Sequence, residues 1–319
     1  MAQSSVAPSS SAPNAAGIAV ADTQLENVRP GPWRRASRNP SVIFGGLVIL
    51  TMILVGIFAP LLDTMNPTEI SPAARHRAPG FERTVRDGEG KETQVLHRFG
   101  TDSLGRDVYS RTIYGARVSI FVGFAVAFLS VSIGLMIGLI SGYFRWLDPL
   151  IMRIMDGLMA IPAILLAIAL LSLFRAGLGA VILAITVPEI PRVVRLVRSV
   201  VLSVREEPYV EAAITTGTPT HKLLWRHVLP NTVAPLIVQG TFICASAILV
   251  EAILSFLGIG IPPETPTWGN IMAEGRMVFR LHTHSILYPG IFLGLTVLAV
   301  NMLGDGLRDT LDPKMAKRV

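Results

Sequence analysis

The chain has 319 residues, of which 51% are hydrophobic and only 16% are charged, and its formal net charge is +6. Soluble domains carry about 25% charged residues, so this composition predicts a membrane protein surrounded by lipid. The basic residues flank apolar segments instead of gathering on one soluble face, which argues against nucleic acid as a partner.

The N-terminal part predicts a tail followed by a membrane anchor. Residues 1–38 are rich in Ala, Ser and Pro and contain four arginines near their end, so we expect a disordered cytoplasmic tail. Residues 39–62 carry no charge. At about 1.5 Å per residue this run crosses a hydrocarbon core of about 30 Å. The polar residues 63–113 hold few large apolar side chains, so we expect a loop that packs on the membrane domain.

Residues 114–306 predict five further membrane helices. The expected fold is therefore all-α and polytopic, with six transmembrane helices. Pro162 should kink the third span. The fourth meets Pro188 and Glu189 early, so we expect a short apolar part that continues as a polar helix into the cytosol. Spans two to six are expected at residues 118–144, 148–174, from 176, 232–258 and 285–304.

Basic residues set the orientation of these spans. Four lie in the N-terminal tail, six between residues 192 and 226 and four between residues 308 and 318, whereas the short outer turns hold three. Cytoplasmic loops of membrane proteins carry the excess of Lys and Arg. We therefore expect both termini, including a C-terminal tail at 307–319, in the cytoplasm, and residues 63–113 in the periplasm.

The most informative segment covers residues 203–230, between the fourth and fifth spans. Pro208 suits the first turn of a helix, where its missing N–H would be unpaired in any case. Gly217 permits a sharp exit at the end of this helix. A Thr-Pro pair follows and is typical of the start of a second short helix, which we expect Pro230 to end. The segment predicts a soluble helix-turn-helix on the cytoplasmic side.

This segment resembles the EAA loop by which permease subunits of bacterial ABC importers dock onto their ATPase subunits. A glutamate there would accept a charge-assisted bond from an Arg or Lys of the partner, and small alanines would let the helix seat in a groove. Where the usual pattern has Ile, this chain has His, which the resemblance associates with the peptide-importer branch. The matching residues are Glu211, Ala212, Ala213, Gly217, His227, Leu229 and Pro230.

Further blocks resemble the C-type permease subunit of dipeptide, oligopeptide and nickel importers, over roughly residues 38–319. They are Gly105-Arg106-Asp107, Tyr114-Gly115-Ala116-Arg117, Glu251 to Gly258, Trp268-Gly269 and Gly304 to Pro313. The resemblance implies the type I ABC importer permease fold, an inner-membrane location and peptide transport, with nickel or another small solute as the alternative.

The same resemblance implies the partners. They are a homologous second permease, two cytosolic ATPases that hold the ATP and Mg²⁺, and a periplasmic or lipid-anchored solute-binding protein. No cofactor is expected in this chain.

Glu251 is the one carboxylate well inside a predicted span. An ionisable residue there costs about 2.5–3.5 kcal/mol on insertion scales, so it should not face lipid. One interpretation places it on the translocation path or at the seam with the second permease. The other is a buried acid whose oxygens accept hydrogen bonds from Ser, Thr or backbone groups.

Two histidines and two aromatic residues lie near the predicted outer surface. His282 and His284 are two residues apart and would point apart on a helix, so we expect neutral interfacial histidines and no metal site. Trp268 and Tyr288 are expected in an aromatic belt at the outer interface.

The sequence lacks the motifs of an ATPase or hydrolase. None of the four lysines completes a Gly-x₄-Gly-Lys-Ser/Thr phosphate-binding loop, and neither HExxH nor GxSxG occurs. We therefore expect a non-catalytic subunit. Two other classes are alternatives: a proton-coupled secondary carrier with Glu251 as its relay, and a membrane-anchored receptor with residues 63–113 as its outer domain. A carrier of that kind would usually show repeated halves, which this chain lacks.

Overall fold

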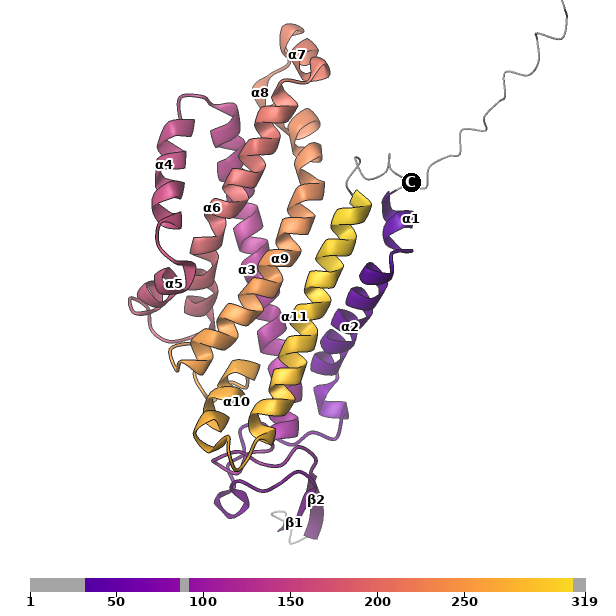
Figure 1. The fold of residues 1–319 in the computed structure, drawn as a ribbon, viewed down its shortest axis with the longest axis vertical. Coiled ribbons are helices and arrows are strands. Elements are labelled where there is room, and N and C mark those ends of the chain that lie inside the picture. The colour runs from indigo at the N-terminus through magenta and orange to yellow at the C-terminus, as the bar shows by residue number, and fades with distance from the viewer. Residues whose placement is uncertain (1–31, 87–91, 312–319) are drawn as a thin grey trace, which may run out of the picture.

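The computed structural model describes residues 32–86 and 92–311, and the structural statements that follow refer to these residues. Most of the expected disordered tail, and residues 312–319 of the C-terminal tail, lie outside them. Within the expected tail, Pro32–Ala36 forms the short helix α1, which packs against α11 (His284–Leu311). The described chain is an elongated bundle of helices with a β-hairpin at one end (Figure 1).

The first long helix is α2 (Pro40–Ile57), which coincides with the anchor predicted over 39–62. Asn39 caps it, because its side-chain oxygen accepts a hydrogen bond from a first-turn N–H at 2.9 Å. A Cβ on Gly45 would stand 2.5 Å from the carbonyl oxygen of Ala299 in α11. Glycine therefore permits the close packing that fixes α2 on the last helix.

Helix α3 (Val108–Tyr143) begins ten residues before the predicted second span. The reason is Asp107, whose carboxylate accepts the Ser110 N–H at 2.7 Å and caps the helix within the expected loop. The loop predicted over 63–113 therefore ends at Asp107. Along α3, three glycines four residues apart receive three valines of α6 (Leu178–Arg205): Gly134, Gly138 and Gly142 face Val193, Val197 and Val201.

The third predicted span is broken rather than kinked. Helix α4 (Asp148–Met159) and helix α5 (Ala163–Leu171) meet at an angle of 87°. Pro162 stands at the break and cannot continue the α4 hydrogen bonds. Helix α6 then runs without interruption through Pro188 and Pro191, and its second half is basic, as the sequence predicted for the fourth span.

Helix α7 (Pro208–Thr215) and helix α8 (Thr220–Leu223) follow at the other end of the bundle from the hairpin (Figure 1). Pro230 does not end the second helix, contrary to the prediction. A π-helical segment, Leu224–Val228, joins α8 directly to α9 (Leu229–Phe256). The Leu229 N–H bonds the Leu224 carbonyl five residues back, and Pro230 lies in the first turn of α9. We attribute the continuity to this wider turn, which accommodates the missing N–H of proline.

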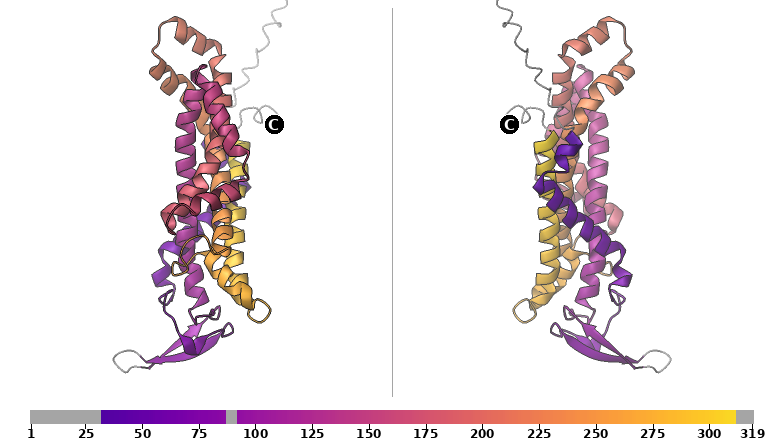
Figure 2. Two further views of the ribbon diagram at one scale, coloured as in Figure 1. Left: turned by 90° about the vertical axis from the view of Figure 1, so that its left-hand side faces the viewer. Right: turned by 90° about the vertical axis from the view of Figure 1, so that its right-hand side faces the viewer.

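The hairpin end contains the only two strands among the described residues, so the fold is mostly helical. The 3₁₀ turns Ala59–Leu61 and Pro72–Ala74 lead to β1 (Phe81–Arg86), which pairs antiparallel with β2 (Glu92–His97). Helix α10 (Trp268–Gly275) and a 3₁₀ turn, Arg276–Val278, lie at the same end (Figures 1 and 2).

Within the described residues, four helices are long and apolar enough to cross a membrane, or five if the bent α4–α5 pair is one span. They are α2, α3, the continuous helix from Thr220 to Phe256, and α11. Helix α6 is outside this set, and it carries four arginines and a glutamate.

Candidate coupling site

The EAA-like segment protrudes from one end of the bundle (Figures 1 and 2). Pro208 occupies the first turn of α7, as predicted. Three apolar side chains, Val210, Leu223 and Val228, are 0–1% exposed and join the core. These anchors hold α7 and α8 on the membrane domain while the opposite face stays free.

The matching residues divide between the two faces of α7. Glu211 and Ala212 are exposed, whereas Ala213 is half-buried against the core. Tyr209 and Ile214, which the sequence did not single out, are 46% and 45% exposed. Together these side chains present an acidic group, a small residue and apolar surface, which is the chemistry of a docking face.

Gly217 forms the exit from α7. Its φ is +80°, and no atom would lie within 4 Å of a Cβ placed on it, so backbone conformation and not space favours glycine. The Thr218 N–H donates to the Ala213 carbonyl at 3.1 Å, and the Gly217 N–H donates to the Ile214 carbonyl at 3.0 Å. This is a Schellman ending, which fixes the angle between α7 and α8.

Helix α7 is tied to the base of α9 by two residues that sequence reasoning missed. The Asn231 side-chain N–H₂ donates to the His227 carbonyl at 2.7 Å and to the Tyr209 hydroxyl at 3.2 Å. The rings of Tyr209 and His227 are 6.0 Å apart. Of the remaining matching residues, Leu229 is half-buried and Pro230 is exposed. No sequence signal pairs Tyr209 with Asn231, because 22 residues separate them.

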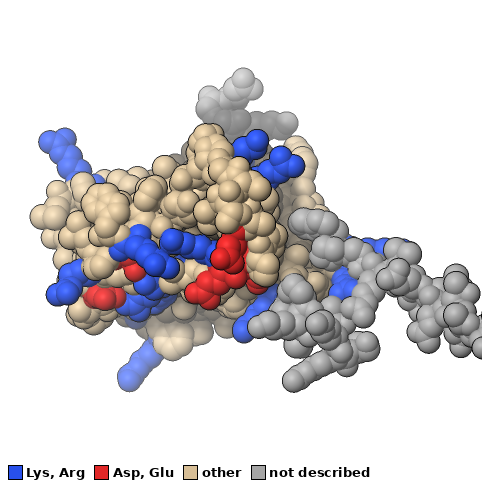
Figure 3. All heavy atoms as spheres, turned by 90° about the horizontal axis from the view of Figure 1, so that it is seen from above, with Lys and Arg blue, Asp and Glu red and all other residues tan. Residues whose placement is uncertain are grey.

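Ion pairs connect α4 to α6, the helix that leads into this site. Arg198 donates to both oxygens of Asp148 at 2.5 Å, and Arg195 contacts Asp156 at 2.5 Å, so α4 is held on α6. Seen from this end, basic side chains lie at several places around the margin, with acidic side chains among them (Figure 3). The side chains are partly exposed, so each pair contributes little stability by itself.

Glu251 lies inside the chain, at 0% exposure. The Ser255 hydroxyl donates to it at 2.8 Å, and the Ser119 hydroxyl of α3 is 3.4 Å away. In this conformation Glu251 faces neither an open path nor a free seam. Its geometry is that of the second interpretation, a buried acid among hydroxyl groups.

At the hairpin end, a buried ionic cluster joins α3 and the segment before it to α10. Arg106 donates to Asp102 at 2.7 Å and also contacts Glu274, and Arg111, which is fully buried, donates to Glu274 at 3.2 Å. Burial raises the pKa of Glu274, and the guanidiniums of Arg111 and Arg106 counteract this rise. The segment before α3 therefore packs on the helical bundle, as its composition predicted.

The aromatic-belt prediction is wrong for Trp268, which is 0% exposed and donates its indole N–H to the Thr112 carbonyl at 3.0 Å. Tyr288 is half-buried and stacks on Phe99 with ring centroids 3.9 Å apart.

His284 is buried, and its Nε2 is 3.2 Å from the Thr101 carbonyl. His282 is half-buried, and its ring stacks on that of His76 at 4.9 Å. In the described part of the chain, no group of three or more His, Cys, Asp or Glu residues is placed to hold a metal ion.

The comparisons with known proteins agree with this architecture. The family of binding-protein-dependent transport system inner membrane components matches residues 118–317. The chain belongs to this family. The N-terminal transmembrane domain of oligopeptide transport permease C also matches residues 32–79, which include α1 and α2.

Two curated relatives illustrate the family. A probable peptide ABC transporter permease of Sinorhizobium fredii is 50% identical over 285 residues, which are 89% of this chain and 93% of the relative. A dipeptide transport system permease of Alkalihalophilus pseudofirmus is 41% identical over 289 residues, which are 89% of this chain and 90% of the relative.

A solved structure of the MetNI methionine ABC transporter, in an inward-facing conformation, shares the fold. The TM-score is 0.51 at 19% identity, over 63% of this chain and 95% of the matched chain. Over the matched part, the present chain has the fold of that chain of the ABC transporter.

Proposed function

We propose that this chain is a permease subunit of an ATP-driven importer for di- or oligopeptides, located in the bacterial inner membrane. The peptide and dipeptide transport named for its relatives supports the substrate class. A homologous second permease would complete the translocation path, and a solute-binding protein would deliver the peptide. Nickel or another small solute is the alternative cargo within the family.

The proposed topology has six spans, with both termini and α7–α8 in the cytoplasm and the β-hairpin in the periplasm. The bent α4–α5 pair is the third span, and α6 is the fourth. Support for α6 comes from its course, because it returns the chain along the bundle from α5 to α7 (Figure 1). Its arginines lie toward the proposed cytoplasmic end, where the positive-inside rule expects them.

The observation that carries the proposal is the exposed face of α7 above side chains that are buried in the core. Glu211 and Ala212 are free to contact another protein, while Val210 is fully buried beneath them. A movement of α7 would pass to the membrane through the Tyr209–Asn231 bond and through the helix that continues into α9.

The mechanism would be alternating access. ATP binding would close the two cytosolic ATPases, α7 would move with its ATPase, and the attached membrane helices would tilt to open the path outward. Hydrolysis would reverse the movement. The chain itself supplies a bundle with two arrangements, and the nucleotide changes their populations.

The carrier alternative gains no support from Glu251. Its oxygens lie among serine hydroxyls, and among the described residues no second carboxylate contacts it. A proton relay would need a further titratable group in reach.

Reconstitution tests the proposal. The chain is co-expressed with its partner permease and ATPases, placed in proteoliposomes and supplied with the binding protein and a labelled dipeptide. We expect uptake that requires ATP and the binding protein, and no ATP hydrolysis by the purified chain alone. ATP hydrolysis by the isolated chain would refute its assignment as a non-catalytic subunit.

A further inference from the structure

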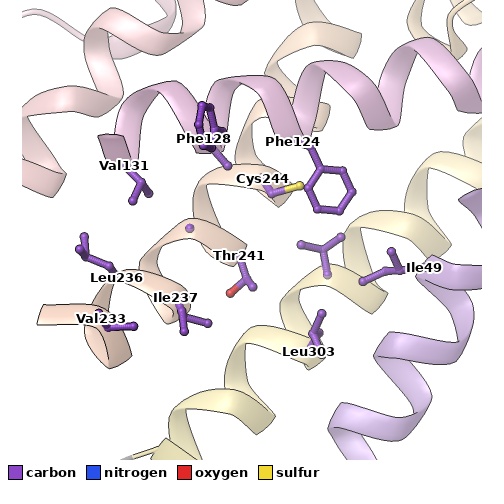
Figure 4. Close-up of a pocket in the computed structure, with 13 residues that line it drawn as sticks. Ile49, Phe124, Phe128, Val131, Val233, Leu236, Ile237, Thr241, Cys244 and Leu303 are labelled. Carbon is purple, nitrogen blue, oxygen red and sulfur yellow. The ribbon is translucent and has the colours of Figure 1, made fainter. Parts of the chain in front are cut away.

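Two faces of α9 differ in their chemistry. One lines an apolar groove with α2, α3 and α11, where Cys244 and Gly240 lie (Figure 4). The other lines a groove of about 690 Å³ between α6, α9 and α11, and it carries polar side chains. In Figure 1, α9 runs between α6 and α11. The polar residues of this groove are Asn231, Gln239 and Arg308.

Gln239 makes the second groove polar within the membrane span. It follows Thr232, where the predicted fifth span begins, by seven residues, which is about 10 Å along the helix axis and therefore inside the span. The neighbouring hydroxyls of Thr232 and Thr241 donate to carbonyls of their own helix at 2.7 Å. The half-buried Gln239 amide makes no hydrogen bond to a described residue. Since hydrocarbon offers no partner to such an amide, this face must meet water or another polar molecule.

The backbone adds polarity on the same face. Pro235 lines the groove and lacks the N–H that would otherwise bond the Asn231 carbonyl four residues earlier. Arg308 lies exposed in the last turn of α11 and lines the same groove. Polar groups therefore extend from the end of the groove at Asn231 and Arg308 to the depth of Gln239.

We propose that this groove is the wall that the chain contributes to the translocation path, and that Gln239 contacts the peptide as it passes. A primary amide both donates and accepts hydrogen bonds, so it matches the N–H and C=O groups of any peptide backbone. It also carries no charge that would hold the peptide in place. The inference rests on the proposed transport function and assigns the face of the molecule that performs it.

Cysteine accessibility tests the assignment, and the chain offers a matched pair. The single native cysteine is first removed by Cys244→Ala. Gln239→Cys and Gly240→Cys are then made separately in that background, and each is assembled into the full transporter. Positions 239 and 240 lie at nearly the same depth but on opposite grooves. A Cβ on Gly240 would have no neighbour closer than 3.6 Å, so the control is tolerated sterically.

A membrane-impermeant thiosulfonate should label Gln239→Cys faster than Gly240→Cys by on the order of tenfold or more, because the reactive thiolate forms in water and not in lipid. A lipid-soluble maleimide should label both. The path assignment would be overturned if the thiosulfonate labelled Gln239→Cys in no nucleotide state. Equal labelling of both positions would also overturn it.

Uptake tests the peptide contact separately. Gln239→Leu should lower dipeptide uptake severalfold, while Gly240→Ala should transport like the parent. Stimulation of ATP hydrolysis by the loaded binding protein should persist in both, which shows that the complex is assembled and coupled. Normal uptake by Gln239→Leu would overturn the contact. Loss of stimulation in the unmodified complex would instead count against the proposed function itself.

Discussion

Replacing Gly217 by valine should uncouple the transporter without disturbing its membrane helices. A Cβ at this position meets nothing within 4 Å, so the cost is confined to the backbone at φ +80°. A β-branched residue is strained there by about 1–3 kcal/mol. Gly217 closes the Schellman ending of α7, so this strain acts on the angle between α7 and α8. An energy of this size changes the population of the native angle by about 5- to 150-fold.

A graded series makes the reasoning testable. Gly217→Asn should be tolerated best, because Asn visits positive φ, followed by Gly217→Ala and then Gly217→Val. Gly157→Val is the control, since Gly157 is exposed in α4, without positive φ or close neighbours. Peptide uptake and peptide-stimulated ATP hydrolysis are measured per assembled complex. If Gly217→Val transported as well as Gly217→Asn, the backbone argument would be refuted.

Further variants test three other contacts. A Cβ on residue 138 would lie 2.7 Å from a valine of α6, so Gly138→Leu should overpack the contact between α3 and α6. We expect the free energy of unfolding to fall by about 1–3 kcal/mol, measured by thermal unfolding. Gly46→Leu is the control, because a side chain there meets open space. Asn231→Ala should lower uptake per ATP hydrolysed, and Tyr209→Phe should lower it less, because Asn231 also bonds a backbone carbonyl. Arg111→Ala removes one of the two arginines that pair with the carboxylates of Asp102 and Glu274, and should cost up to about 3–5 kcal/mol, seen as a falling membrane level of the chain.

Four of the predicted spans coincide with long apolar helices, because a charge-free apolar run of sufficient length favours membrane insertion. The residues at which helices begin were harder to predict. Asp107 is an N-cap signal in the sequence, yet the polar residues after it suggested a loop. These polar residues include Arg111, which is fully buried. Their burial depends on contacts with distant residues such as Glu274.

The candidate site was predicted only in part, because local sequence signals do not reveal contacts between distant residues. Gly217 ends a helix through local geometry, so its role followed from sequence. Pro230 was expected to break a helix, but the π turn before it absorbs the missing N–H. Trp268 was placed at the interface by its residue type, whereas its indole bonds a carbonyl of α3 inside the bundle. Tyr209 and Asn231 meet only because the fold brings the first turn of α7 beside the first turn of α9.

The central claim is that the exposed face of α7 couples this permease to an ATPase, and a charge reversal at Glu211 tests it most directly. Glu211→Lys is compared with Glu69→Lys, which makes the same charge change at an exposed position in the outer loop. Both are measured at equal membrane levels for ATPase association and ATP-dependent dipeptide uptake. The account predicts that Glu211→Lys loses association and uptake although the binding protein still loads peptide, while Glu69→Lys retains both. Full uptake and ATPase association with Glu211→Lys would contradict it.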